Sequence, residues 1–448
     1  MTVLDRIARG VGRLGAAATL AGRTLLSVDT NPVPGDWVHV TKIDPEDAKK
    51  LPLAYPRYLS RTDGISVGGS ADVTETNSIE TFRLLSAVST PAFHEPSAAT
   101  HVTRETLSAS TFLAIPQVLN GDHEAFVGTL GTGTRFIREE MTPAAIDRAL
   151  PRAVVDRYGD RLCEFLTRWM LFSSPFEAYI IQNPDSAAAR EAGVDQSDVL
   201  SPRQARERAM AAERYLGSEI LYVEYSGTYG GTEAADLLDA VDSGLSWSRL
   251  WYGGGIDSRE KATAVLDAGA DTVVVGDAFH RIATEEVELA TRFLSDSEVG
   301  ASAHADRIAH WLEEAVDVDG SAAAEFLSTI PSVGNPVATA REFLTAGIAA
   351  HCTLASAAAD VREAVTGGRI ASPDGIPRAY RVDYADRLAT HLLPSGAGGG
   401  SAASGLPSDV LEAVSARAFE EAFDGQSEQS LPTDSFPLHH VPLVDPPT

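Results

Sequence analysis

The stretch "ILYVEYSGTYGG", residues 220–231, is an apolar run that carries polar side chains at every second position. Successive side chains of a β-strand point to opposite faces, so Tyr222, Glu224 and Ser226 share one face of a predicted strand. The apolar residues between them predict that this strand is buried, and glycine then ends the run. We infer that the strand ends at a site that needs one carboxylate and two hydroxyl groups.

Seven further short apolar runs, rich in β-branched residues, repeat along the chain. Helix-like segments such as "SPRQARERAMAAERYL" and "SREKATAVLDAG" lie between several of them. Eight βα units over roughly 250 residues match a (β/α)8 barrel of the TIM type, so the predicted fold class is α/β. The eight predicted strands are residues 37–44, 64–69, 91–96, 111–119, 178–183, 220–225, 249–255 and 272–277.

The spacing of the runs departs from a regular barrel at one place, residues 121–177. This stretch includes the apolar and aromatic segment "CEFLTRWMLFSSPF". We interpret it as a helical insertion that covers the barrel or forms a contact between subunits. An ordinary helix followed by a long loop is the alternative. The barrel domain is predicted to span residues 36–295, and we expect a homo-oligomer.

Two segments flank the predicted barrel. Residues 1–35 carry four arginines among apolar residues at helical spacing, which is typical of a basic amphipathic helix. Such a helix either rests on anionic lipid at the membrane or packs on the barrel. Residues 301–448 read as a mainly helical accessory region, with a flexible glycine- and serine-rich linker at 394–405. Because the recognisable motifs end before Leu294, we expect the barrel to fold without this region.

Composition excludes several classes of protein. The 448 residues carry a formal net charge of -27, which excludes nucleic-acid binding as a main task. Only four of the 36 basic residues are lysines, and this acidic, lysine-poor composition favours a halophilic archaeon. The two cysteines form no metal or disulfide pattern, and no uninterrupted apolar run approaches 18 residues. We therefore expect a cytoplasmic protein, peripheral at the membrane if its first helix binds lipid.

The carboxyl ends of the predicted strands carry polar residues and glycines. In a TIM barrel these ends form the active site, and the loops after strands seven and eight commonly bind phosphate. Glycine in those loops lets backbone N–H groups approach an anion closely. The strand-end residues are Lys42, Asp44, Gly68, Gly69, Ser70, Glu95, Ser97, Asn120, Asn183, Tyr222, Glu224, Ser226, Gly253–Gly255, Gly276 and Asp277.

The order of these elements resembles a known family. "HVTKIDPE", "SVGGSADVT", "EPS", "VLN", "YIIQNPDS", "YVEYSGTYG", "YGGGI" and "VVVGD" follow one another over about residues 36–294. The series is similar to the geranylgeranylglyceryl phosphate synthases and the heptaprenylglyceryl phosphate synthases. The resemblance implies a Mg²⁺-dependent prenyltransferase that joins a polyprenyl diphosphate, such as geranylgeranyl diphosphate, to the sn-3 hydroxyl of sn-glycerol 1-phosphate. That reaction forms the first ether bond of archaeal lipids.

The resemblance also implies roles for the matching residues. Lys42 matches a lysine that contacts glycerol phosphate, and Asp44 and Ser70 match Mg²⁺ ligands. Glu224 is the candidate that takes the proton of the attacking hydroxyl. Where this chain has Asp257 the family often has a basic residue, which Arg259 replaces only if the loop bends. The residues that match the glycerol-phosphate strand are Tyr222, Val223, Glu224, Tyr225, Ser226 and Gly227, and those that match its phosphate-gripping backbone are Gly255, Gly276 and Asp277.

Two other functions fit the same predicted barrel. One is another phosphate-binding barrel enzyme, such as a sugar-phosphate isomerase or an aldolase. The other is a non-catalytic descendant that acts as a binding or scaffold protein through its helical tail. An apolar groove long enough for a polyprenyl chain favours the prenyltransferase, a short pocket favours the isomerase or aldolase, and an obstructed phosphate site favours the scaffold.

Overall fold

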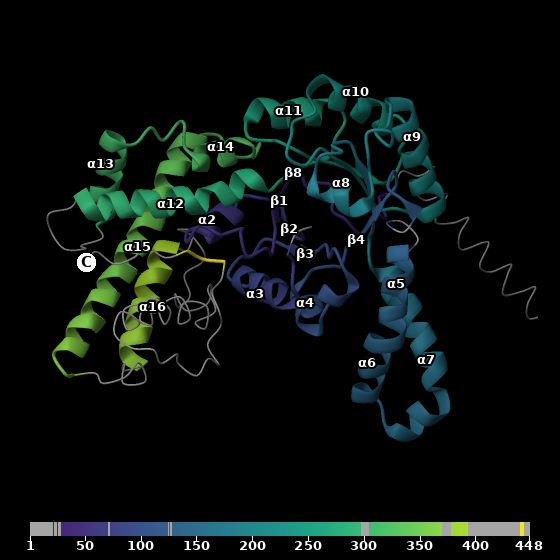
Figure 1. The fold of residues 1–448 in the computed structure, drawn as a ribbon, viewed down its shortest axis with the longest axis horizontal. Coiled ribbons are helices and arrows are strands. Elements are labelled where there is room, and N and C mark those ends of the chain that lie inside the picture. Colours follow the sequence, from purple (N-terminus) through teal and green to yellow (C-terminus); the bar gives the residue numbers. More distant parts are fainter. Residues whose placement is uncertain are drawn as a thin grey trace, which may run out of the picture.

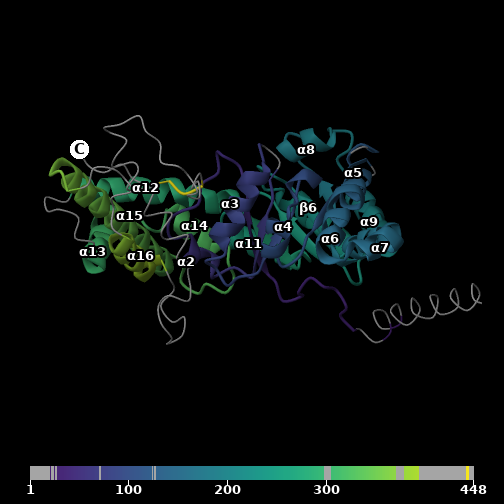
Figure 2. The ribbon, with the colours of Figure 1, turned by 90° about the horizontal axis from the view of Figure 1, so that it is seen from below.

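The computed structural model describes residues 21, 25, 28–69, 72–123, 125, 128–296, 304–369, 378–392 and 440–442. The predicted amphipathic extension at 1–35 therefore lies largely outside the described residues, and the predicted linker at 394–405 lies wholly outside them. Figures 1 and 2 show the described part of the chain from two directions.

Eight parallel strands form one sheet in the order β3-β2-β1-β8-β7-β6-β5-β4. Figure 1 labels β1 to β4 and β8 at the centre of the barrel. Its two outer strands meet through a single bridge between His94 and Leu113, where His94 N donates to Phe112 O and Ala114 N donates to His94 O. The sheet thus curls into a TIM-like barrel, which confirms the predicted fold class. The strands are β1 (His39–Ile43), β2 (Gly64–Val67), β3 (Ala92–His94), β4 (Ile115–Val118), β5 (Phe176–Ile181), β6 (Ile220–Glu224), β7 (Arg249–Gly253) and β8 (Thr272–Val275).

Helices follow most strands and cover the outside of the barrel. Side chains of the strands that face outward are buried against them, as expected for a parallel sheet covered on its outer face. The helices are α2 (Tyr55–Leu59), α3 (Glu75–Leu85), η1 (Ala99–His101), α4 (Arg104–Ala109), α8 (Ala187–Ala192), α9 (Pro202–Ala211), η4 (Ala212–Leu216), α10 (Gly231–Asp242), α11 (Arg259–Asp267) and α12 (Asp277–Asp296).

The stretch between β4 and β5 is helical for most of its length. Four consecutive helical segments, α5 (Thr129–Phe136), η3 (Ile137–Met141), α6 (Thr142–Ala149) and α7 (Arg152–Ser173), form a hairpin. Figure 1 shows this hairpin extending away from the barrel. The helical interpretation of the insertion is therefore the one that the structure supports, and a long irregular loop is not present among the described residues of this segment.

Four more helices follow β8 and α12 at the opposite end of the molecule from the hairpin (Figures 1 and 2). Tyr58 of α2 is fully buried, and its ring packs on the rings of Phe279, Phe326 and Phe343 at centroid distances of 6.4, 6.2 and 5.0 Å. One hydrophobic core therefore runs from the barrel into these helices. They are α13 (Ala305–Ala315), α14 (Ala322–Ser328), α15 (Pro336–Thr366) and α16 (Arg378–Leu392).

Helix α15 is long and apolar enough, by length and composition, to cross a membrane. However, 78% of its most apolar window is buried inside the protein. A helix that is apolar on most sides and surrounded by protein is typical of a core helix. We therefore treat α15 as the central helix of the C-terminal bundle.

A buried carboxylate ties α15 to the start of α2. Glu286 of α12 is fully buried, accepts hydrogen bonds from Leu53 N and Ala54 N, and lies 3.2 Å from Nε2 of His351 in α15. Gly347 lies against it: a Cβ atom at this position would be 2.1 Å from Glu286 Oε2. The absence of a side chain at residue 347 is thus what lets α15 approach the carboxylate.

We expect Gly347→Ala to destabilise the protein. The new methyl group would displace the Glu286 carboxylate and break its hydrogen bonds with Leu53 N and Ala54 N. Leaving buried hydrogen-bonding groups without partners costs about 1–3 kcal/mol, and thermal unfolding followed by circular dichroism measures the loss. Gly159→Ala in α7 is the matched control, because its Cβ would meet only Val155, at 3.5 Å. Replacing a helix-interior glycine by alanine normally stabilises, so equal melting temperatures in the two variants would contradict this account.

Candidate active site at the carboxyl ends of the strands

A cavity of about 740 Å³ opens at the carboxyl ends of the strands. This is the end at which TIM barrels carry their active sites. Most of the strand-end residues predicted from the sequence line it. They are Lys42, Asp44, Gly69, Glu95, Ser97, Asn183, Tyr222, Glu224, Ser226, Gly227, Gly253, Gly254, Gly255, Gly276 and Asp277.

The floor of the cavity is organised around Glu95. Lys42 Nζ lies 2.8 Å from Glu95 Oε1, Ser66 Oγ donates to Oε2 at 2.6 Å, and the Tyr179 hydroxyl donates to Oε1. Burial acts to raise the pKa of Glu95, but the Lys42 charge and these hydrogen bonds outweigh it and hold the pKa below its usual value. Glu95 is therefore ionised and fixes the position of the Lys42 ammonium group.

Lys42 carries a permanent positive charge at this floor. Burial acts to lower the pKa of Lys42, but the negative charge of Glu95 and the other nearby acidic groups, Glu224 among them, raise the pKa well above its usual value. The ammonium group therefore stays protonated, which suits a contact with a phosphate oxygen.

Two tyrosines form one wall beside Lys42. The rings of Tyr179 and Tyr222 stack at a centroid distance of 4.5 Å, and Lys42 Nζ lies 6.0 Å from the centroid of the Tyr222 ring. Gly253 on the neighbouring strand leaves room for Tyr222, since a Cβ atom there would lie 1.9 Å from the Tyr222 hydroxyl oxygen. The position of Tyr222 thus depends on a close approach between β6 and β7.

Glu224 is buried at the end of β6, where the Ser226 hydroxyl donates to its Oε1. Asn183 Nδ2 in turn donates to Ser226 O at 2.6 Å and holds that turn against β5. Burial raises the pKa of Glu224, although the Lys42 charge and the Ser226 hydrogen bond oppose the shift. A carboxylate with a raised pKa that faces a cavity is suited to accept a proton from a substrate hydroxyl.

The alternation of strand β6 corrects part of the sequence-based site. Tyr222, Glu224 and Ser226 line the cavity, whereas Val223 and Tyr225 point to the outer face and pack in the core between strands and helices. The Tyr225 hydroxyl donates to Glu233 of α10 at 3.2 Å. The side chains of Val223 and Tyr225 therefore do not contact a substrate in this cavity. Gly227 has φ +80°, a conformation that favours glycine, and turns the chain away after the strand.

The loops after β7 and β8 face the cavity with glycine. Gly255 has φ +54°, and the Lys261 ammonium donates to its carbonyl oxygen at 3.2 Å and to Asp257 Oδ2 at 2.7 Å. Arg259, the residue expected to supply positive charge here, instead donates to Val333 O at 2.6 Å in the segment between α14 and α15. The positive charge next to this loop thus comes from Lys261.

Lysines gather around this cavity. Lys42 and Lys49 line it, and Lys261 borders its glycine loop, so three of the four lysines in the chain lie here. Lys49 Nζ lies 2.8 Å from Asp277 Oδ1 and 3.6 Å from Asp44 Oδ2. Each of the three ammonium groups is paired with a carboxylate, Lys42 with Glu95, Lys49 with Asp277 and Lys261 with Asp257, so the cavity offers positioned cations to a phosphate group.

Of the two predicted Mg²⁺ ligands, only Asp44 is among the described residues. Asp44 lines the cavity and its carboxylate lies 3.9 Å from His280 Nε2, whereas Ser70 lies outside the described residues. Among the described residues, no group of three or more His, Cys, Asp or Glu side chains could hold a metal ion. The donors fit a Mg²⁺ ion held by one or two carboxylates and completed by water and substrate oxygens, which is how Mg²⁺ is usually bound.

Several site residues were not predicted from the sequence. Tyr179 pairs in register with Tyr222, and Lys49 and Ser66 contact Asp277 and Glu95. The alternation in "FEAYII" could have placed Tyr179 on the inner face, but its contact with Glu95 depends on the register of distant strands. Asn120, by contrast, was expected to line the site, but it bonds to backbone atoms of Ile181 and Asp198 and is not among the lining residues.

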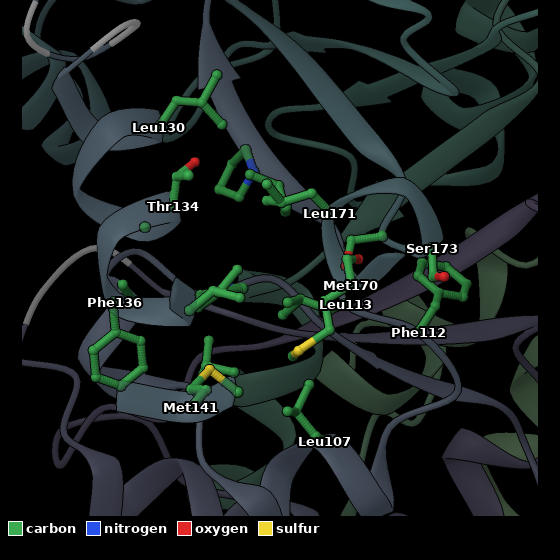
Figure 3. Close-up of a pocket in the computed structure, with 18 of the residues that line it drawn as sticks. Leu107, Phe112, Leu113, Leu130, Thr134, Phe136, Met141, Met170, Leu171 and Ser173 are labelled. Carbon is green, nitrogen blue, oxygen red and sulfur yellow. The ribbon is translucent and has the colours of Figure 1, made fainter. Parts of the chain in front are cut away.

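A second, apolar cavity of about 370 Å³ lies between the barrel and the hairpin. Figure 3 shows side chains of α5 and η3 facing those of α7 and of the segment before β4 across it. Ser97 and Pro116 line both cavities, so the apolar cavity meets the polar one at these two residues. Its apolar lining includes Val102, Leu107, Phe112, Leu113, Leu130, Phe136, Ile137, Met141, Trp169, Met170 and Leu171.

Comparison with known proteins places this arrangement in a family. A family model described as the PcrB family matches residues 35–291. Geranylgeranylglyceryl phosphate synthase of Methanocella arvoryzae is 31% identical over 247 residues, which cover 55% of this chain and 91% of that protein. The synthase of the same name from Halobacterium salinarum is 30% identical and covers 56% and 92%. Heptaprenylglyceryl phosphate synthase of Listeria innocua is 34% identical and covers 57% and 97%.

Solved structures are also similar to the chain. The crystal structure of (S)-3-O-geranylgeranylglyceryl phosphate synthase from Thermoplasma acidophilum, in complex with its substrate sn-glycerol-1-phosphate, has a TM-score of 0.40 and 23% sequence identity. The match covers 55% of this chain and 87% of that chain.

Proposed function

Because this chain belongs to the PcrB family, we propose that it is a prenylglyceryl phosphate synthase that joins a polyprenyl diphosphate, with geranylgeranyl as the expected prenyl group, to the sn-3 hydroxyl of sn-glycerol 1-phosphate. The observation that carries the proposal is the meeting of the two cavities at Ser97 and Pro116. One cavity offers charged and hydroxyl groups to a phosphorylated polyol, and the other offers apolar side chains to a prenyl chain.

Glycerol 1-phosphate would lie in the polar cavity. Its phosphate would face the glycine loops after β7 and β8 and the ammonium group of Lys42, and its hydroxyl groups would face Tyr222, Glu224 and Ser226. The sn-3 oxygen then attacks the first carbon of the prenyl group, and the bond from that carbon to the diphosphate oxygen breaks with its electron pair. The Glu224 carboxylate takes the proton of the attacking hydroxyl.

Negative charge accumulates on the departing diphosphate. Lys49 also lines the cavity and would face the diphosphate, and Asp44, with Ser70, would hold the Mg²⁺ ion. A bound Mg²⁺ ion would neutralise part of the negative charge of the diphosphate. Glu95 has a positioning role, because it fixes the Lys42 ammonium group through a 2.8 Å ion pair.

Incubating the purified full chain with labelled sn-glycerol 1-phosphate, Mg²⁺ and prenyl diphosphates of increasing length tests the proposal. The expected result is a labelled, solvent-extractable product whose yield depends on prenyl length. Absence of product with every prenyl diphosphate, while glycerol 1-phosphate still binds, would favour the non-catalytic descendant. Turnover of a sugar phosphate in place of prenyl transfer would favour the isomerase or aldolase.

We expect Asp44→Asn to lose most turnover and most of the dependence on Mg²⁺ concentration, because the amide is a weaker ligand for a hard cation than the carboxylate. Initial rates measured across a Mg²⁺ series for the wild type and the variant check this. Asp236→Asn on the exposed face of α10 is the control for the loss of one negative charge. Normal product formation by Asp44→Asn would show that the metal ligand is another residue.

A further inference from the structure

The long helix of the hairpin, α7, exposes a row of large apolar side chains. Val154, Tyr158, Phe165, Trp169 and Phe172, here called the α7 face, are 37, 45, 61, 56 and 89% exposed. Their spacing of four, seven, four and three residues puts them on one side of a helix. Only Thr167 is buried in this 22-residue helix. More than a third of each of these side chains is exposed, so the face is an apolar surface open to solvent in the described part of the chain.

The apolar exposure is concentrated in this hairpin. Of the ten large hydrophobic residues that are exposed in the described part of the chain, six lie between Leu150 and Phe172. Scattered single residues of this kind are normal on a soluble protein, whereas a contiguous apolar surface marks an interaction site. The α7 face thus differs from the rest of the described surface.

The charge of the hairpin is also unlike the rest of the chain. Residues 129–173 contain seven arginines and six acidic residues, a net charge of +1, whereas the whole chain has -27 and the remainder therefore -28. Arg161 and Arg168 lie within about 60° of Phe165 around the helix axis. Glu164, which pairs with Arg168 at 2.7 Å, lies about 100° away, and Asp156 and Asp160 lie roughly 140–180° away. Arginine thus lies closer to the α7 face than the acidic residues of the same helix do.

The α7 face leads into the apolar cavity. Trp169 is 56% exposed and also lines the cavity, and Met170 and Leu171 of the same helix face its interior (Figure 3). A prenyl chain that left a bilayer at α7 would therefore reach the cavity without crossing water. This step rests on the proposed function, which requires a substrate whose chain is soluble in lipid.

We propose that the α7 face docks on an anionic lipid surface. Tyrosine and tryptophan are enriched at the membrane–water boundary, and a helix with aromatic residues bordered by arginine binds anionic lipid in the plane of the interface. A second copy of the chain fits less well, because a two-fold contact through the same helix brings the bordering arginine rows toward each other. The partner is thus a bilayer with negatively charged headgroups.

Vesicle flotation of the full chain tests the proposal, with neutral phosphatidylcholine vesicles and vesicles that also contain phosphatidylglycerol. Wild-type protein is expected to float with the anionic vesicles. Phe165→Ser combined with Phe172→Ser is expected to lower the partition coefficient at least about tenfold, since burying one such side chain is worth roughly that factor. Tyr215→Ser is the matched control, because Tyr215 is 89% exposed, like Phe172, but lies outside the hairpin.

Three outcomes overturn the proposal. The double variant could float like the wild type, which would place the lipid contact elsewhere. Equal binding of the wild type to neutral and anionic vesicles would show that the arginines do not contribute to lipid binding. Light scattering could instead show a wild-type dimer that the double variant turns into a monomer, with no flotation of either, which would make the α7 face a contact between copies.

Activity separates this proposal from the proposed function. With a short, water-soluble prenyl diphosphate, the double variant is expected to turn over at the wild-type rate, because Phe165 and Phe172 do not line either cavity. With a long prenyl diphosphate embedded in vesicles, its rate is expected to fall in proportion to its loss of flotation. Flotation without turnover would leave the docking surface standing and refute the synthase assignment, and an unchanged rate with embedded substrate would refute the docking role.

Discussion

Glu224→Gln should lower turnover by about 10²–10⁴-fold, the range typical for loss of a general base. Glutamine keeps the shape of the side chain and can still accept the hydrogen bond from Ser226, but it cannot take the proton of the attacking hydroxyl. The apparent affinity for glycerol 1-phosphate should change little, because the carboxylate is needed more in the transition state than in the ground state. Steady-state kinetics together with the melting temperature of the same preparation give both quantities.

Glu177→Gln is the matched control for this substitution. Glu177 is also a buried carboxyl group inside the barrel, and burial raises the pKa of Glu177 well above its usual value, so its neutral form is favoured. Glutamine resembles that neutral form, and turnover should stay close to that of the wild type. A similar fall in both variants would point to a shared effect on packing and would defeat the catalytic assignment of Glu224.

The pH profile gives a second measure of the same role. Because burial raises the pKa of Glu224, the basic form is lost at a higher pH than for an ordinary glutamate. The turnover number of the wild type should therefore fall as the pH decreases through this raised pKa. The fall should be absent from the residual activity of Glu224→Gln, since the group that titrates has been removed.

Truncation after Asp296 should leave a protein that does not fold stably, contrary to the expectation from the sequence. The cut removes Phe326 and Phe343, which cover the buried ring of Tyr58. Exposing a side chain of this size costs about 1.5–3 kcal/mol, and several are exposed together. A domain has only about 5–15 kcal/mol of stability in total. Soluble yield and circular dichroism of the truncated chain check the prediction.

The truncation also separates polar partners. Buried His39 on β1 loses Thr329, whose Oγ1 lies 3.0 Å from His39 Nε2. Buried Glu286 loses its contact with His351 Nε2. Deleting residues 394–405 is the control, because this glycine- and serine-rich stretch has the composition of a linker and its loss should leave the melting temperature unchanged. A folded, soluble product of the truncation with a wild-type melting temperature would show that the C-terminal helices form an independent module.

The sequence predicts the barrel well because each strand is a short, β-branched apolar run, and buried parallel strands need little else to be recognised. The alternation of side chains along each strand is enough to predict that Lys42, Glu224 and Ser226 face the cavity. Val223 and Tyr225 were included because the whole matching run was carried over, although alternation puts their side chains on the outer face.

The remaining features depend on contacts between distant parts of the chain. Glu95 meets Tyr179, 84 residues away, only because of the strand order around the barrel. Arg259 and Lys261 are two residues apart, yet one bonds to Val333 and the other to Gly255. The local sequence does not contain this information, because arginine and lysine are both long, flexible cations and the tertiary fold decides which acceptors each can reach.

The single bridge between β3 and β4 has a consequence for motion. The other seven strand boundaries are ladders of three to five paired residues, whereas this boundary has one bridge, with backbone hydrogen bonds from Thr111 N, His94 N and Ala114 N. Local opening should therefore cost least free energy here, and these three amides should exchange their hydrogens with solvent before those of β5 and β6. Phe112 and Leu113 at this seam also line the apolar cavity, so the barrel can widen beside a longer chain without breaking any ladder.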